Sequence, residues 1–270
     1  MTKNNASSPF GHKGMSRRDM LAAGAVLPLA QILGNRALAA EAAAETKTVT
    51  IKAPSGRDIS AAWAAPAASK APALLLVHEW WGLNDQIKAV ATECARLGYG
   101  ALAIDLYGGK AAANGDAATA KALVSSVKDG EAGETLAAWI DWLRASSGVK
   151  GVATLGWCFG GGWSLAASIL RPVEATVVYY GRVNRTADEL RHLKGPVLGH
   201  FANRDPNINH EMVAGFEAAM KEAGQRYEDY WYEADHAFAN PTTARYDEAD
   251  AKLAWSRTLD FLKTHLSPSP

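Results

Sequence analysis

A five-residue turn in the second half of the chain constrains its fold more than any other feature. Residues 156–160 read Gly-Trp-Cys-Phe-Gly and follow a short apolar run over residues 152–155. The pattern has the form of a nucleophile elbow, G-x-S-x-G, with Cys158 in place of serine, in which a buried strand ends and a helix begins at once. Glycines flank such a turn because its backbone is strained and tightly packed. The alternative is a buried cysteine in a glycine-rich strand-helix turn.

Strand and helix patterns alternate along most of the chain. Apolar runs separated by amphipathic segments indicate a mostly parallel central sheet with helices on both faces, an α/β fold. A hairpin is expected to open the sheet around Pro54-Ser55-Gly56. We predict strands at residues 48–51, 59–63, 73–77, 100–104, 152–155, 175–180, 196–201 and 227–232, and helices at residues 86–97, 116–145 (one or two), from the elbow to 170, 209–223 and 247–266.

The N-terminus has the pattern of an export signal. Residues 16–21 read Ser-Arg-Arg-Asp-Met-Leu, a twin-arginine pattern, and an apolar stretch to about residue 33 and an A-x-A sequence at 37–39 follow in order. We therefore expect residues 1–39 to be a signal peptide that the twin-arginine export machinery recognises, and residues 40–270 to be a single periplasmic domain. The alternative is a basic tail followed by an amphipathic helix.

Two classes of partner are not expected. The apolar stretch near the N-terminus is too short to be a convincing membrane anchor, so no stable anchor is expected after cleavage. The formal net charge of the whole chain is zero, which gives no reason to expect a nucleic-acid partner.

In folds with a nucleophile elbow, the acid and the histidine of the triad follow later strands of the sheet, and two residues of this chain occupy such positions. Asp205 follows the strand predicted at 196–201, and His236 follows the strand predicted at 227–232. Taken singly, each has a plain alternative, since an aspartate before proline is a common turn residue and a histidine is often a surface loop residue. Together they predict a triad in which Cys158 attacks as a thiolate, His236 accepts the proton and Asp205 orients the imidazole.

Several blocks of sequence resemble the dienelactone hydrolase family of α/β hydrolases. The resemblance implies an α/β-hydrolase fold and hydrolysis of a lactone or carboxylic ester through a Cys-His-Asp triad and an acyl-cysteine intermediate. It also implies that no metal or organic cofactor takes part. The matching blocks are residues 78–84, 105–107, 156–161, 179–181, 205–206, 235–240 and 254–258.

The segment after the strand at 73–77 is expected to complete the site. Backbone N–H groups of Phe159 and Trp80 are expected to form the oxyanion hole. The resemblance implies that Glu79 interacts with the resting thiol and is displaced by substrate, and a nearby anion raises the pKa of a cysteine. The alternative is that Glu79 caps the following helix. No metal site is predicted, because Gly82 stands where the zinc motif H-E-x-x-H requires histidine.

Two positions depart from the family members that cleave dienelactones. Those members carry an arginine where this chain has Gly109 and another where it has Asn240, and the pair receives the substrate's carboxylate. A neutral ester, lactone or thioester therefore fits this chain better. Aromatic walls suit a planar or apolar acyl group, although core packing accounts for each ring equally well. The residues expected to line the substrate pocket are Trp81, Tyr107, Tyr180, Phe238 and Asn240.

Two other classes of function stay open. The same fold could serve a ligand-binding protein that catalyses nothing. An exposed, reactive Cys158 could also serve a thiol redox or peroxide-responsive protein, although no resolving cysteine lies nearby in the sequence. The second cysteine, Cys94, has the spacing of a buried helix face, so we expect it in the core rather than in a disulfide.

Overall fold

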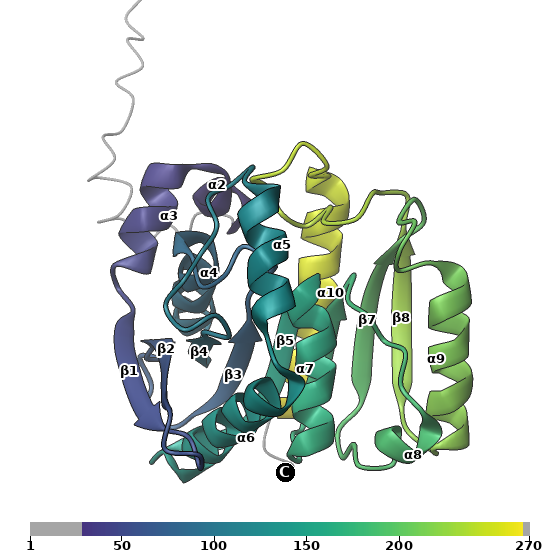
Figure 1. Cartoon of the computed structure of the whole chain (residues 1–270), viewed down its shortest axis with the longest axis horizontal. Coiled ribbons are helices and arrows are strands. Elements are labelled where there is room, and N and C mark those ends of the chain that lie inside the picture. The colour runs from purple at the N-terminus through teal and green to yellow at the C-terminus, as the bar shows by residue number, and fades with distance from the viewer. Residues whose placement is uncertain (1–28, 267–270) are drawn as a thin grey trace, which may run out of the picture.

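An eight-stranded sheet runs through the centre of the molecule in the order β1-β2-β4-β3-β5-β6-β7-β8 (Figure 1). This computed structural model describes residues 29–266, and the twin-arginine pattern lies outside them. Strands β3 to β8 pair in parallel, whereas β1 and β2 are antiparallel at one edge, so the predicted sheet is confirmed. The strands are β1 (Lys47–Lys52), β2 (Asp58–Ala64), β3 (Ala71–Val77), β4 (Gly100–Ile104), β5 (Val149–Trp157), β6 (Ala175–Tyr179), β7 (Val197–Ala202) and β8 (Tyr227–Tyr232).

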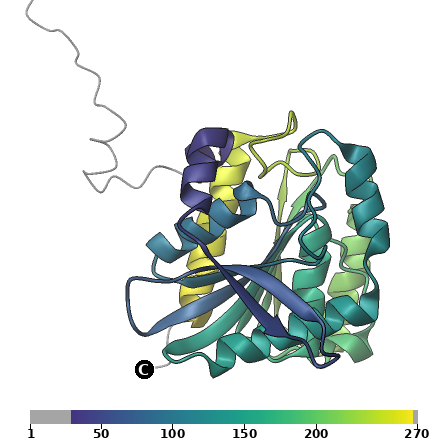
Figure 2. The same ribbon diagram turned by 60° about the vertical axis from the view of Figure 1, so that its left-hand side comes forward.

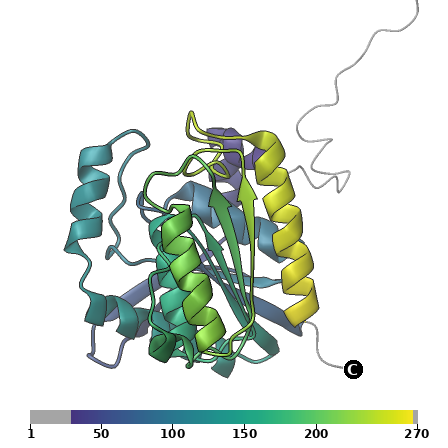
Figure 3. The ribbon, with the colours of Figure 1, turned by 90° about the vertical axis from the view of Figure 1, so that its right-hand side faces the viewer.

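Helices cover both faces of the sheet, as the turned views show (Figures 2 and 3). One face carries α2, α3, α4 and α10, and the other carries α6, α7 and α9. Within residues 29–266 no helix has both the length and the apolar character needed to cross a bilayer. The helices are α2 (Leu29–Gly34), α3 (Arg36–Ala43), α4 (Asp85–Arg96), α5 (Ala117–Ser126), α6 (Asp129–Ala145), α7 (Phe159–Leu170), α8 (Ala187–Leu190), α9 (His210–Glu222) and α10 (Glu248–Leu266).

The central strand β3 shows why its residues form a doubly covered strand. Leu74 and Leu76 belong to the core cluster beneath α4 and α10, whereas Leu75 and Val77 belong to the cluster beneath α6 and α7. Successive side chains of a strand point to opposite faces, so a strand buried on both faces needs an unbroken apolar run. Cys94 lies on the buried face of α4, as expected, and is a free thiol.

Three short helices, α2, α3 and α8, are not among the elements predicted from the sequence. In α8, Thr186 and Glu189 form a capping box, but four residues are too few to show a helical period. The pair α2 and α3 precedes β1 and packs on α4. Ala39 and Ala42 of α3 are buried there, and the Thr92 hydroxyl donates to the Ala42 carbonyl at 2.7 Å. Residue 39, the expected end of a signal peptide, therefore lies inside a helix.

The turn between β5 and α7 requires glycine on both sides of Cys158. A Cβ atom on Gly156 would lie 2.0 Å from the carbonyl oxygen of Gly160, and one on Gly160 would lie 2.2 Å from that of Val77. Cys158 itself has φ 54° and ψ −119°, a conformation that side-chain-bearing residues rarely adopt. The predicted strand-turn-helix geometry of the elbow is present.

Replacing one of these glycines should be costly. Gly160→Ala should lower the free energy of unfolding by about 3 kcal/mol or more, because the added methyl meets backbone atoms that cannot move aside. Gly215→Ala in α9, where a Cβ meets nothing within 4 Å, is the control and should raise stability by about 0.5–1 kcal/mol. Urea denaturation followed by circular dichroism measures both. Equal effects would contradict the packing argument.

Candidate active site

The carboxyl ends of β5, β7 and β8 bring three predicted residues into contact. His236 Nε2 lies 3.1 Å from Cys158 Sγ, and His236 Nδ1 lies 2.5 Å from Asp205 Oδ2. Cys158 stands at the elbow after β5, Asp205 in the turn after β7, and His236 in the segment after β8. Parallel strands end at the same edge of a sheet, which is why residues so distant in the sequence meet there.

Asp205 is held from both sides. One carboxylate oxygen faces His236, and the other accepts the backbone N–H groups of Asn207 at 2.9 Å and Ile208 at 3.1 Å. Burial acts to raise the pKa of this carboxyl, but the hydrogen bonds outweigh burial and lower its pKa. Asp205 therefore presents a fixed negative charge to the imidazole.

His236 lies between two groups that favour its protonated form. Burial acts to lower the pKa of the imidazole, but the hydrogen bonds with Asp205 and Cys158 outweigh burial and raise its pKa to about 10. An imidazole that is protonated at neutral pH stabilises a thiolate at hydrogen-bonding distance. The arrangement can therefore supply a nucleophilic sulfur and, on the same side chain, a proton for a leaving group.

Backbone strain is concentrated around this cluster. Within residues 29–266 the non-glycine residues with positive φ are Cys158, Tyr180 at 36° and Ala237 at 68°. Tyr180 follows β6 and its ring lies 5.2 Å from that of His236, while Ala237 directly follows His236. Such conformations cost free energy and persist where the surrounding packing enforces them, which is characteristic of functional sites.

Glu79 does not cap the following helix. Asn84 is the N-cap of α4 and accepts the backbone N–H of Ile87 at 3.2 Å, so the capping interpretation of Glu79 is wrong. The Glu79 carboxylate accepts the Tyr180 hydroxyl at 3.3 Å and the side-chain amide of Asn240. Burial raises the pKa of this carboxyl. Among the described residues no hydrogen bond joins Glu79 to the Cys158 sulfur.

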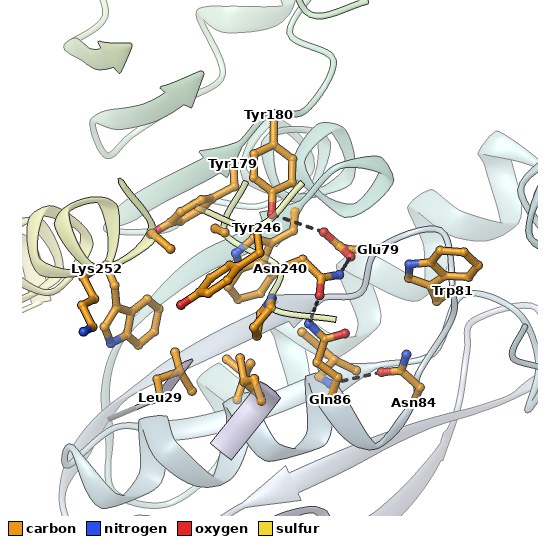
Figure 4. Close-up of a pocket in the computed structure, with 18 of the residues that line it drawn as sticks. Leu29, Glu79, Trp81, Asn84, Gln86, Tyr179, Tyr180, Asn240, Tyr246 and Lys252 are labelled. Atoms are coloured by element: carbon orange, nitrogen blue, oxygen red, sulfur yellow. Dashed lines mark hydrogen bonds between the residues drawn. The ribbon is translucent and has the colours of Figure 1, made fainter. Parts of the chain in front are cut away.

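Asn240 is the centre of a polar network that the sequence patterns did not reveal (Figure 4). Its carbonyl oxygen accepts the Gln86 side-chain amide at 2.8 Å and both the N–H and hydroxyl of Thr242, at 2.9 and 2.7 Å. These bonds orient the Asn240 amide group toward Glu79. Gln86 belongs to α4, whereas Thr242 follows β8, and no sequence spacing relates them.

Two cavities flank this network. The larger, of about 990 Å³, is lined by Cys158, His236, Trp80 and Phe159. The smaller, of about 100 Å³, lies beside Glu79 and contains neither Cys158 nor His236 in its lining. Of the predicted pocket residues, Tyr180 lines both cavities, and Trp81 and Asn240 line the smaller one.

The other two predicted pocket residues line neither cavity. The Tyr107 ring is buried and its hydroxyl donates to the Trp80 carbonyl at 3.2 Å, and the Phe238 ring is completely buried in the core. Tyr107 thus supports the segment that carries Trp80.

Phe159 is the first residue of α7, where backbone N–H groups have no partner within the helix. Among residues 29–266 no cluster of His, Cys, Asp or Glu side chains could hold a metal ion.

Known proteins resemble the chain along most of its length. The dienelactone hydrolase family model matches residues 59–266. A Saccharolobus solfataricus protein named "Putative carboxymethylenebutenolidase" is 29% identical over 229 residues, covering 71% of this chain and 88% of that protein. A Bradyrhizobium protein named "Probable 2-oxo-3-(5-oxofuran-2-ylidene)propanoate lactonase" is 28% identical over 209 residues, covering 72% and 84%. A crystal structure of a "Putative Dienelactone Hydrolase" from Klebsiella pneumoniae matches with a TM-score of 0.68 at 28% identity, covering 80% and 98%.

The imidazole should make protein stability depend on pH. Because the folded-state pKa of His236 is raised, the stability it contributes is complete below its unfolded pKa of about 6.5 and is lost as the pH rises through about 10. The wild-type advantage over His236→Gln in free energy of unfolding should shrink by on the order of 2 kcal/mol between pH 7 and pH 10. Urea titrations at several pH values measure it, and a difference independent of pH would contradict the ion pair.

Proposed function

The chain belongs to the dienelactone hydrolase family, and we propose that it hydrolyses a lactone or carboxylic ester through an acyl-cysteine intermediate. The observation that carries the proposal is the hydrogen-bonded chain from Asp205 through His236 to Cys158 at the wall of the larger cavity. A thiolate is the reactive form of cysteine, and a protonated imidazole at 3.1 Å from the sulfur favours it.

The reaction runs in two halves. The Cys158 sulfur bonds to the carbonyl carbon, and the N–H groups of Phe159 and Trp80 stabilise the negative oxygen of the tetrahedral intermediate. His236 then gives its proton to the departing alkoxide, leaving an acyl-cysteine. In the second half His236 takes a proton from water, the resulting hydroxide attacks the acyl carbon, and the acid leaves while the sulfur departs as thiolate. Asp205 keeps the imidazole oriented throughout.

Two positions where the family resemblance implies arginine carry no charge in this chain, which supports a neutral substrate. Gly109 has no side chain, and its N–H donates to Asp105, which holds that loop. Asn240 is engaged with Glu79, Gln86 and Thr242 and brings no charge. Neither position offers the bidentate carboxylate contact that arginine supplies. The aromatic part of the larger cavity's wall, Trp80, Phe159 and Trp163, suits an apolar acyl group, and charged side chains that include Arg182 and Arg185 line another part.

We propose that Glu79 modulates the nucleophile indirectly. Its carboxylate accepts the Tyr180 hydroxyl, and the Tyr180 ring lies against the His236 ring. The positive charge of His236 acts to lower the pKa of Glu79, so the two groups are within electrostatic range. An anion at this place stabilises the imidazolium and disfavours a second anion on the sulfur.

The export expectation remains a proposal as well. The twin-arginine pattern at residues 16–21, the apolar stretch and the A-x-A sequence support export to the periplasm and a mature domain from residue 40. The zero net charge supports neither a nucleic-acid partner nor an electrostatic membrane contact.

Neither alternative function gains support from a specific contact. The sequence holds two cysteines, and Cys94 is buried in the core, where burial raises the pKa of its thiol to about 12. A resolving cysteine needs access and thiolate character, and Cys94 has neither. A binding protein without catalysis would have no need of the strained Cys158 backbone or the buried Asp205 carboxylate.

Hydrolysis should depend on one of the two cysteines. Cys158→Ala should lower turnover of p-nitrophenyl acetate by about a thousandfold or more, because it removes the sulfur that forms the acyl intermediate. Cys94→Ala, which also removes one thiol, should keep turnover within about twofold because Cys94 lies outside the site. Release of p-nitrophenol measures both variants, after circular dichroism has shown that they are folded. Equal turnover by wild type and Cys158→Ala would contradict the proposal.

Glu79 should restrain the reactivity of the thiol. Glu79→Gln should raise the rate of Cys158 alkylation by iodoacetamide at neutral pH by roughly twofold to tenfold, because an anion near the sulfur is removed. Mass spectrometry of the labelled peptide follows the rate, and the buried Cys94 serves as an internal control. An unchanged or lower rate would show that Glu79 only positions Tyr180.

A further inference from the structure

A completely buried histidine directly after β3 has both of its ring nitrogens engaged. His78 Nε2 lies 3.2 Å from the backbone nitrogen of Leu106, and His78 Nδ1 lies 2.6 Å from the carbonyl oxygen of Glu79. The Leu106 N–H can only donate and the Glu79 carbonyl can only accept, so Nε2 accepts and Nδ1 donates. Burial lowers the pKa of the imidazole and keeps it neutral at neutral pH. The two contacts therefore fix a single tautomer, with the proton on Nδ1.

The hydrogen bond from His78 sets the direction of the peptide group that joins Glu79 to Trp80. That peptide is trans, so its N–H, which belongs to Trp80, points opposite to its C=O. The C=O points to the buried imidazole and also accepts the Gly82 N–H at 3.2 Å. The Trp80 N–H therefore points away from His78, and Trp80 lines the larger cavity.

The N–H groups of Trp80 and Phe159 are both free to meet a substrate. Among residues 29–266 neither N–H has a hydrogen-bond partner, and both residues line the larger cavity together with Cys158. Backbone N–H groups are seldom left unpaired in a protein, so two free ones beside a nucleophile indicate a bound acceptor. A donor on the carbonyl of the same peptide also polarises the Trp80 N–H and strengthens it.

His78 also contacts the segment that supplies the second N–H. Its ring packs against that of Tyr107, with centroids 4.6 Å apart, and lies nearly parallel to that of Phe159 at 5.9 Å. The His78 carbonyl oxygen is so close to Gly160 that an added Cβ there would lie 2.4 Å from it. The imidazole is therefore confined between the two segments that carry the free N–H groups.

We propose that His78 is a positioning residue, which directs the Trp80 N–H at the negative oxygen of the tetrahedral intermediate. The inference rests on the proposed hydrolysis at Cys158. His78 lines neither cavity, so it acts through the peptide between Glu79 and Trp80. Without the Nδ1 donor this peptide is free to rotate, and the N–H loses its direction toward the substrate.

Two reactions of the same sulfur separate this role from a general one. Release of p-nitrophenol from p-nitrophenyl acetate, in a single turnover with enzyme in excess, measures acylation, which passes through an oxyanion. Alkylation by iodoacetamide displaces iodide at a saturated carbon and forms no oxyanion, so it measures the reactivity of the thiolate alone. Loss of an oxyanion donor should therefore slow the first reaction and leave the second unchanged.

The test variants remove or restore the donor at residue 78. His78→Phe keeps an aromatic ring without its nitrogens and should lower the acylation rate constant about tenfold to a hundredfold, with alkylation within about twofold of wild type. His78→Leu, a smaller side chain without a donor, should behave in the same way. His78→Gln supplies one donor and one acceptor and should acylate within about fivefold of wild type.

A control variant removes a buried imidazole elsewhere. His200 hydrogen-bonds with Tyr232 and Thr258, and His200→Leu should keep acylation within about threefold of wild type. Circular dichroism shows which variants are folded.

The inference is overturned if folded His78→Phe or His78→Leu acylates as fast as wild type, if alkylation falls as far as acylation, if His78→Gln restores nothing, or if His200→Leu slows acylation equally. If the wild type releases p-nitrophenol no faster than Cys158→Ala, the hydrolase proposal fails, and the role of His78 fails with it.

Discussion

The contact between the first turn of α7 and the backbone at the end of β3 determines the geometry of the whole site. With no side chain at Gly160, the helix approaches the carbonyl groups of Val77 and His78, which an added Cβ would meet at 2.2 and 2.4 Å. This approach sets Cys158 at a positive φ, with its sulfur directed to the sheet edge. It also brings the segment that carries Glu79 and Trp80 beside the start of α7, so nucleophile and expected oxyanion donors share one rigid support.

The second constraint is electrostatic. The buried Asp205 carboxylate and the His236 imidazole stabilise each other's charged forms, because their hydrogen bond lowers the pKa of Asp205 and raises the pKa of His236. Glu79 adds a further carboxyl nearby, and burial raises its pKa while Asn240 and Tyr180 hold it by hydrogen bonds. The Glu79 carboxylate is thus held by two neutral donors, the Tyr180 hydroxyl and the Asn240 amide.

Much of this architecture could be predicted because its signals are local. The apolar runs and the elbow locate the strands, and the positions of Asp205 and His236 after later strands predict their meeting, which the structure brings about. Contacts between distant segments left no such signal. Gln86 and Asn240 are 154 residues apart and meet only through packing. The burial of Tyr107 and Phe238 could not be predicted from the sequence either, because an aromatic residue near a strand end has the same local pattern whether it faces a cavity or the core.

Helix α3 overlaps the end of the proposed signal peptide and also packs against α4 of the domain. Its alanines are buried against α4, the Thr92 hydroxyl binds its backbone, and Arg96 of α4 pairs with Glu45 just beyond it at 2.6 Å. A peptidase requires an extended, accessible backbone, which a packed helix denies. If residues 1–39 are the signal peptide proposed above, α3 must separate from α4 before a peptidase can cleave the chain. The mature protein would then expose the surface of α4 that α3 covers in the precursor. The rate of processing would depend on how readily α3 detaches from α4.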